Sequence, residues 1–228
     1  MATVIDQQPS SFKCPNLGPA PGSDEGVQGP VKIRSMRNEA ADWKFAGDLT
    51  VEAFIDKFIH ATSENSIPNV KECIGKQNSI QDSWFCERKF IAEYEGQPAG
   101  LLCMKYHGDP EPRSGDSFDS LGCCDSCGMW FLGCMSWTDV SEGKAYIDHI
   151  CVDDRFRGKG IGKVMMERAE YEAKARGCSK IFLYVSWTNR ARNLYERQGF
   201  TVTESSCLFG FIWCTMGVTG FYKMEKDL

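Results

Sequence analysis

The sequence predicts a mixed α/β (α+β) fold, and three observations support it. Seven short segments carry the apolar patterns of strands, and segments with apolar residues at helical spacing lie among them. The strand-like segment 145–152 leads into a glycine-rich run at 157–163, and that run opens a segment with helical spacing. The chain has 228 residues, which is enough for one domain with a core of its own.

The first 30 residues hold five of the nine prolines. Such a composition buries too little apolar surface to offset the entropy lost on ordering. We therefore expect a flexible tail at 1–30 and a folded domain over 31–228. The domain is expected to begin with a strand at 31–37, followed by helices at 48–62 and 66–78.

A hairpin and a long connection come next. Segments 88–94 and 99–106 have strand patterns and are joined by a turn-rich tetrapeptide, so an antiparallel hairpin is predicted. Residues 107–143 are too many for a hairpin loop and are interpreted as an insertion. The insertion holds the pair Cys124 and Cys127 at zinc-ligand spacing. Because no second C-x-x-C or histidine pair accompanies it, we expect no metal.

The remaining strands are predicted at 145–152, 180–185, 200–205 and 220–226. The last two are separated by the apolar segment 207–217. We expect this segment to extend the two strands and pack on the insertion. An apolar lid over a substrate, or an interface patch, is the alternative.

The glycine-rich run has the properties of a phosphate site. Glycines allow close approach of the backbone, and the first N–H groups of a helix have no intrahelical partner. The spacing is not G-x-G-x-x-G, and Val164 stands where a Walker loop needs Ser or Thr. What remains is R-x-x-G-x-G, at Arg157, Gly160 and Gly162.

This motif resembles the acetyl-CoA signature (Q/R)-x-x-G-x-(G/A) of the GNAT acyltransferase superfamily. The segment 189–200, with Ala191, Tyr195 and Gly199, resembles the family's N-x-x-A-x-x-x-Y-x-x-x-G-F helix, except that Thr188 holds the usual asparagine position and Asn189 comes one residue late. The resemblance implies a twisted sheet of six to seven strands flanked by helices. It implies transfer of an acetyl group from acetyl-CoA to a primary amine, either a small amine or polyamine or a peptide N-terminus or lysine.

The resemblance also implies which residues form the site. The backbone near Ile150, Cys151 and Val152 and the side chains of Asn189 and Asn193 would hold the pantetheine arm. The pyrophosphate would lie on the loop and first helical turn, and Tyr195 would protonate the leaving thiolate and contact the cofactor. The residues of that loop and turn are Arg157, Gly158, Lys159, Gly160, Ile161, Gly162 and Lys163.

The base is expected on the strand before the glycine run, at Asp148 or Tyr146. An aspartate with an ordinary pKa near 3.9 is a weak base for an amine, so burial or a relaying water is needed, and Asp148 would otherwise bind the cationic amine. A period of two places Tyr146, Asp148, Ile150 and Val152 on one face. His149 and Cys151 then point to the other face, where His149 is interpreted as a core residue.

Composition narrows the remaining choices. A net charge of -5 gives no general attraction to nucleic acid, and no apolar run approaches the length of a membrane span. The amino terminus lacks a basic region followed by an apolar core, so we expect a cytoplasmic protein with reduced cysteines. The sequence does not decide the oligomeric state, and a dimer is one of the alternatives. The alternative function is an interaction module that holds acetyl-CoA without turnover.

Overall fold

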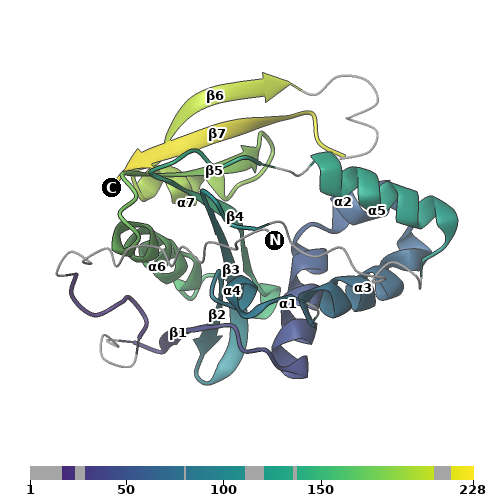
Figure 1. Cartoon of the computed structure of the whole chain (residues 1–228), viewed down its shortest axis with the longest axis horizontal. Coiled ribbons are helices and arrows are strands. Elements are labelled where there is room, and N and C mark those ends of the chain that lie inside the picture. The colour runs from purple at the N-terminus through teal and green to yellow at the C-terminus, as the bar shows by residue number, and fades with distance from the viewer. Residues whose placement is uncertain (1–16, 24–28, 80, 111–120, 136–137, 208–216) are drawn as a thin grey trace, which may run out of the picture.

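The computed structural model describes residues 17–23, 29–79, 81–110, 121–135, 138–207 and 217–228. A seven-stranded sheet runs through the molecule in the order β1-β2-β3-β4-β5-β7-β6 (Figure 1). Its strands are β1 (Val31–Ser35), β2 (Lys89–Tyr94), β3 (Gln97–Tyr106), β4 (Lys144–Val152), β5 (Lys180–Ser186), β6 (Thr201–Cys207) and β7 (Gly220–Asp227). The predicted fold class and all seven predicted strands are confirmed.

The pairing of the strands is mixed. β4 and β5 are parallel and are connected through a helix, whereas every other neighbouring pair is antiparallel. The predicted hairpin of β2 and β3 is confirmed. Parallel neighbours need a crossover connection, and the segment that opens with the glycine-rich run supplies it.

The described helices are α1 (Ala40–Ala53), α2 (Ile55–Ala61), α3 (Ile67–Ser79), α4 (Ser83–Cys86), α5 (Cys123–Met135), α6 (Ile161–Ala175) and α7 (Arg192–Arg197). Short 3₁₀ turns lie at Glu64–Ser66 and Asp154–Phe156. The single helix predicted over 48–62 is wrong: α1 begins earlier, and the chain leaves helical geometry at Phe54, with φ −121° and ψ 30°. The apolar spacing continues across this break, but the two helices pack into different clusters, Leu49 into one and Phe58 into the other.

Helices cover both faces of the sheet. On one face α6 buries Ile161, Met165 and Ala169 against alternate side chains of β3 such as Leu102 and Met104. On the other face α1 packs against the intervening side chains of β3, Leu101 and Cys103, with α3 behind α1. The two-residue period of a strand thus divides the core into two layers.

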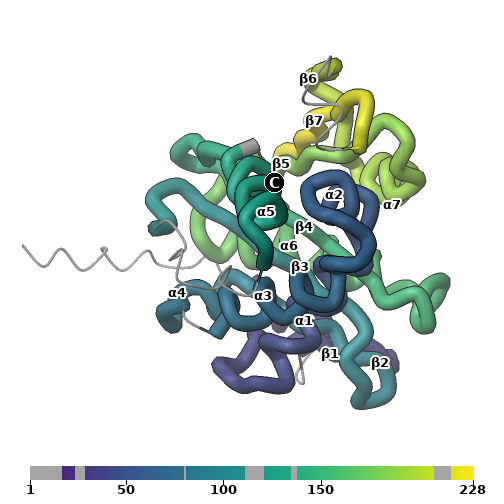
Figure 2. Tube along the Cα trace, turned by 90° about the vertical axis from the view of Figure 1, so that its right-hand side faces the viewer, coloured from purple at the N-terminus to yellow at the C-terminus, as the bar shows by residue number. Residues whose placement is uncertain are grey.

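The insertion contains a helix that the sequence did not predict. α5 lies across α2 (Figures 1 and 2) and buries Met129 and Leu132 in one cluster with Phe58. A Cβ atom on Gly128 would lie 1.7 Å from the carbonyl oxygen of Ala61, so this crossing requires glycine. Residues 111–120 and 136–137 of the insertion lie outside the described residues, as does most of the 207–217 segment.

Part of the expected N-terminal tail is described. The N–H of Ile33 in β1 donates to the carbonyl oxygen of Gly22 at 2.8 Å, so residues 17–23 contact the first strand. Residues 1–16 and 24–28 lie outside the described residues, and the flexibility of that segment stays a prediction.

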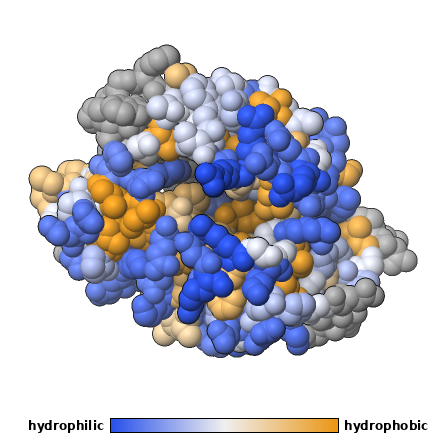
Figure 3. Space-filling view, turned by 180° about the vertical axis from the view of Figure 1, so that it is seen from behind, coloured by the Kyte–Doolittle hydropathy of each residue, from blue (hydrophilic) through white to orange (hydrophobic). Residues whose placement is uncertain are grey.

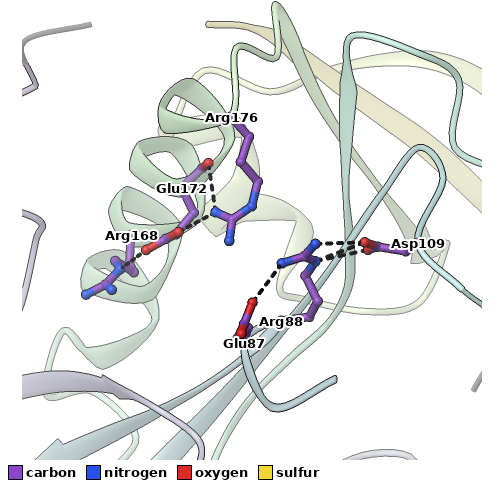
Figure 4. Close-up of polar contacts among 6 residues, drawn as sticks. All are labelled: Glu87, Arg88, Asp109, Arg168, Glu172 and Arg176. Atoms are coloured by element: carbon purple, nitrogen blue, oxygen red, sulfur yellow. Dashed lines mark hydrogen bonds and ion pairs between the residues drawn. The ribbon is translucent and has the colours of Figure 1, made fainter. Parts of the chain in front are cut away.

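A network of ion pairs fixes the carboxyl-terminal half of α6 (Figure 4). The buried carboxylate of Glu172 accepts from Arg168 at 2.8 Å and from Arg176 at 2.5 Å. The guanidinium of Arg176 lies 4.7 Å from the ring centroid of Tyr106 at the end of β3. Buried charges are stable only when they are paired in this way. One end of α6 is therefore anchored to the sheet, which positions the other end and its glycine-rich loop.

Candidate functional site

The glycine-rich run forms the loop that leads into α6. Gly158 and Gly160 have φ values of 77° and 81°, in the left-handed region that glycine adopts without strain. Gly160 is the N-cap residue and makes no side-chain cap. Its carbonyl accepts from the N–H of Lys163 at 3.0 Å, and the N–H groups of Ile161 and Gly162 precede the first helical hydrogen bonds. This helix end therefore offers outward donors suited to a phosphate.

The cations of the loop are exposed and weakly held. Arg157 pairs with Asp154 at 2.5 Å with both side chains largely exposed, and Lys163 lies 3.7 Å from Glu167. Lys159 lies over the ring of Tyr94. Exposed pairs of this kind contribute little to stability. These cations are therefore free to turn toward a bound anion.

Strands β4 and β5 separate next to this loop. Their last parallel pair is Ile147 opposite Leu183, although β4 continues to Val152 and β5 to Ser186. Beyond that pair, none of the described strands pairs with the backbone of β4 on its β5 side. Unpaired backbone groups take hydrogen bonds from ligands or water. The face that carries the loop and α7 is hollowed near its middle, with apolar side chains inside and hydrophilic ones around it (Figure 3).

A β-bulge interrupts β4 at Asp148. In the pairing with β3, Met104 lies opposite Ile147 and Cys103 lies opposite His149. Asp148 is therefore an extra residue without a partner across the ladder. An extra residue bends the strand and reverses the alternation of side chains beyond it.

The bulge makes the predicted sharing of faces wrong. Ile150 and Val152 pack on the α6 side of the sheet, whereas His149 and Cys151 lie on the α1 side. Tyr146 is also on the α1 side, where it stacks on Phe182 with ring centroids 5.0 Å apart. The prediction assumed an unbroken period of two, and the inserted residue breaks it. The strand consequently aims Tyr146 and His149 toward one side.

Asp148 is held by two cations. Its Oδ1 lies 2.7 Å from the Nζ of Lys105, and its Oδ2 lies 2.9 Å from the Nδ1 of His149. The other ring nitrogen of His149 lies 3.4 Å from the hydroxyl of Thr50 in α1. His149, which the sequence assigned to the core on the opposite face, is thus a partner of the expected base. Sequence reasoning missed Lys105 because a cross-strand contact leaves no local pattern. It missed the role of His149, the neighbour of Asp148 on the same strand, because the bulge breaks the period of two that was assumed.

These contacts set the protonation of the site. Burial alone would raise the pKa of the Asp148 carboxyl, but His149 and Lys105 outweigh it and hold that pKa well below its usual range. Burial would lower the pKa of His149, yet Cys103 and Asp148 raise it to about 9. Burial, with the charge of Asp148, raises the pKa of Tyr146. Near neutral pH Asp148 is a carboxylate that already holds two cations, and Tyr146 keeps its proton.

Tyr195 is a buried residue of α7. Its side chain is buried with Phe200 in the α6-side core, and burial raises its pKa, with a smaller contribution from Cys151. Within the part of the chain that the structure describes, its hydroxyl makes no hydrogen bond. A Cβ atom on Gly162 in α6 would lie 3.1 Å from the side chain of Leu194 in α7. Helix α7 therefore packs against the first turn of α6. Tyr195 therefore keeps its proton, and the helix that carries it contacts the first turn of α6.

Asn189 and Asn193 stand at the start of α7. The Oδ1 of Asn189 accepts from the N–H of Ala191 at 2.9 Å, an Asx turn that starts the helical segment. Asn193 is exposed one turn later. Contacts of these two residues with a cofactor stay predictions.

Lys57 approaches the cluster from α2. Its Nζ lies 5.0 Å from the ring centroid of Phe54 and 5.3 Å from that of Phe221 in β7. Burial lowers its pKa, and the charge of Asp148 opposes this effect. The break between α1 and α2 thus brings a cation, two aromatic rings and Asp148 together. We call Lys57, Lys105, Tyr146, Asp148 and His149 the polar cluster.

The cysteines of the insertion stand apart from this site. Cys123, Cys124, Cys127 and Cys134 are exposed free thiols on α5. In the described ranges, no group of three or more His, Cys, Asp or Glu residues is arranged to hold a metal ion. Nor is any described helix long and apolar enough to cross a membrane.

Comparison with known proteins gives a family match over the region of the site. A model described as the acetyltransferase (GNAT) family matches residues 58–200, which include the glycine-rich loop, Asp148 and Tyr195. The match covers more than half of the chain.

Curated relatives resemble shorter stretches. The chain is 37% identical over 73 residues to a mycothiol acetyltransferase of Beutenbergia cavernae, covering 32% of this chain and 24% of the relative. It is 34% identical to the spermine/spermidine N(1)-acetyltransferase of Bacillus subtilis, covering 27% and 42%. It is 31% identical to the thialysine N-epsilon-acetyltransferase of Mus musculus, covering 44% and 57%. The aligned stretches thus span between a quarter and somewhat over half of these relatives.

Solved structures share the fold over most of the chain. An acetyltransferase structure superposes with a TM-score of 0.53 at 20% identity, covering 86% of this chain and 98% of the other. The PaiA N-acetyltransferase of Thermoplasma acidophilum, solved in complex with coenzyme A, gives a TM-score of 0.53 at 17% identity, covering 87% and 99%. At these identities the likeness shows the fold alone.

Proposed function

Because this chain belongs to the acetyltransferase (GNAT) family, we propose that it transfers an acetyl group from acetyl-CoA to a primary amine. The observation that carries the proposal is the separation of β4 from β5 beside the glycine-rich loop. It leaves an unpaired strand edge next to outward helix N–H groups, with the Tyr195 hydroxyl close by. Pantetheine amides and a pyrophosphate need donors and acceptors of these two kinds.

The proposed cofactor site runs from the loop to the strand edge. The first-turn N–H groups of α6 hold the pyrophosphate, and Arg157, Lys159 and Lys163 add positive charge. The backbone of 150–152 pairs with the pantetheine arm, with Asn189 and Asn193 at its side. The thioester then lies near the end of the β4–β5 pairing, between Tyr195 and the polar cluster.

The reaction is a direct transfer. The neutral amine nitrogen attacks the thioester carbonyl carbon, a C–N bond forms, and the C–S bond breaks as the tetrahedral intermediate collapses. The thiolate takes the proton of the Tyr195 hydroxyl and leaves as the CoA thiol. The amine proton passes through water to bulk solvent, and Tyr195 is reprotonated from there. No other reactant is needed.

Asp148 has an electrostatic part in this proposal. Its carboxylate is engaged by Lys105 and His149, which makes it a poor proton acceptor. Tyr146 is protonated and equally unsuited. The sequence left three candidates for the group that removes the amine proton, which were Asp148, Tyr146 and a water relay. The contacts favour the water relay.

The test is release of CoA thiol from acetyl-CoA across polyamines, arylalkylamines, amino acids and short peptides. At least one acceptor class is expected to give steady turnover that depends on acceptor concentration. A blank across the whole panel, with CoA binding intact by calorimetry, would refute enzymatic transfer and leave a module that only binds acetyl-CoA.

A further inference from the structure

The polar cluster holds a surplus of positive charge. Asp148 is the carboxylate whose charge acts on Lys57, and its two oxygens already contact Lys105 and His149. Among the described residues Lys57 makes no ion pair. Its ammonium instead lies over the rings of Phe54 and Phe221. One carboxylate therefore faces three basic groups.

Among the described residues, this ammonium has no carboxylate partner of its own. Lys57 is half-buried between α2 and the start of β7, so the rings of Phe54 and Phe221 replace part of its water. Ring faces attract a cation, but less strongly than a carboxylate does. A ligand that brings a negative group to Lys57 would complete the pairing. A polyamine would bring a second cation to a place that already has too many.

The position of Lys57 makes it a candidate for recognising the acceptor. Its charge interacts with that of Asp148, the residue that follows the last β4–β5 pair, Ile147 opposite Leu183. The cofactor loop lies at the start of α6, the helix that covers the opposite face. A group that binds near Lys57 therefore approaches the thioester from the side away from α6.

We propose that Lys57 binds a carboxylate of the acceptor, so that the acceptor is an amino acid-type molecule carrying both a primary amine and a carboxylate. This inference rests on the proposed function and adds the substrate class. The amine reaches toward the end of the β4–β5 pairing, and the carboxylate lies against Lys57. The rings of Phe54 and Phe221, which contact Lys57, offer apolar surface that suits an aliphatic stem.

A series of acceptors that share one amine tests the proposal. Lysine, lysinamide and cadaverine present the same terminal amine and differ at the carboxylate. We expect kcat/KM for lysine to exceed that for lysinamide and cadaverine by about tenfold or more, which corresponds to about 1.4 kcal/mol. Lys57→Met should remove this preference by lowering the value for lysine alone, and Lys57→Arg should retain most of it. Lys44→Met, an exposed lysine of α1, is the matched control and should behave as wild type.

A binding measurement separates this inference from the proposed activity. Calorimetry of CoA-loaded protein with Nε-acetyllysine and Nε-acetyllysinamide needs no turnover. Tighter binding of the acid, lost in Lys57→Met, supports the carboxylate site even if no acceptor is acetylated. Equal binding of acid and amide, or a preference unchanged in Lys57→Met, overturns it whether or not the enzyme turns over.

Discussion

The charge of His149, which Cys103 and Asp148 favour, should make the stability of the protein depend on pH. The side chain of His149 is 13% exposed, and although burial lowers its folded-state pKa, Cys103 and Asp148 raise that pKa from 6.5 to about 9. Because the pKa of His149 is higher in the folded state, its protonation stabilises the fold fully below about pH 6.5. This contribution to the free energy of unfolding is lost as the pH rises through about 9. Since one pKa unit corresponds to about 1.4 kcal/mol, the contribution is at most about 3 kcal/mol at pH 6. By the same relation it falls to about 2 kcal/mol at pH 7.5 and is mostly lost at pH 9.

His149→Gln tests this reasoning, because glutamine keeps hydrogen-bonding capacity and removes the titrating group. Free energies of unfolding are measured by urea denaturation at pH 6, 7.5 and 9. The difference between wild type and His149→Gln should shrink steadily over that range. His107→Gln is the control, since the His107 ring contacts the backbone carbonyl of Val140 rather than a carboxylate. A His149→Gln difference that stays constant from pH 6 to pH 9 would show that the pair is not charged in the folded protein.

Three further predictions concern catalysis, the cofactor and the insertion. Tyr195→Phe removes one hydroxyl without changing packing, so CoA affinity should hold while kcat falls by about 10²- to 10⁴-fold; full kcat on an identified acceptor would exclude it as proton donor. Gly160→Glu should abolish CoA binding measured by calorimetry, whereas Gly160→Ala, which shares the left-handed strain but adds no charge, should retain more of it. Gly128→Ala forces α5 away from Ala61 and should lower the free energy of unfolding by about 1–3 kcal/mol or more. Gly133→Ala on the same helix, where a Cβ atom meets nothing within 4 Å, should leave the free energy of unfolding unchanged or raise it by up to about 1 kcal/mol. Equal urea midpoints for the two variants would contradict the close crossing.

The sequence by itself was enough to predict where the strands lie along the chain and where the glycine-rich loop opens a helix. Both are written in local patterns: alternation within β2 to β5, glycines at 158, 160 and 162, and the spacing of Tyr195 from Gly199. Such patterns depend only on residues close together in the chain, so they predict an element correctly where no bulge or helix break interrupts the period. The start of α1 and its break at Phe54 were missed for that reason, since the apolar spacing runs on across the break.

Only the tertiary structure decided how the acceptor side is arranged. The bulge at Asp148 follows from the register of β4 on β3, and it turns His149 and Cys151 to the side that the alternation had assigned to others. The contacts of Asp148 with Lys105, and the approach of Lys57 from α2 to Phe221, join residues far apart in the sequence. No local pattern encodes such pairs, because a one-residue change in register alters every neighbour across the sheet. Which charges meet at the site is therefore a property of the packed sheet, and their balance is what selects the acceptor in our proposal.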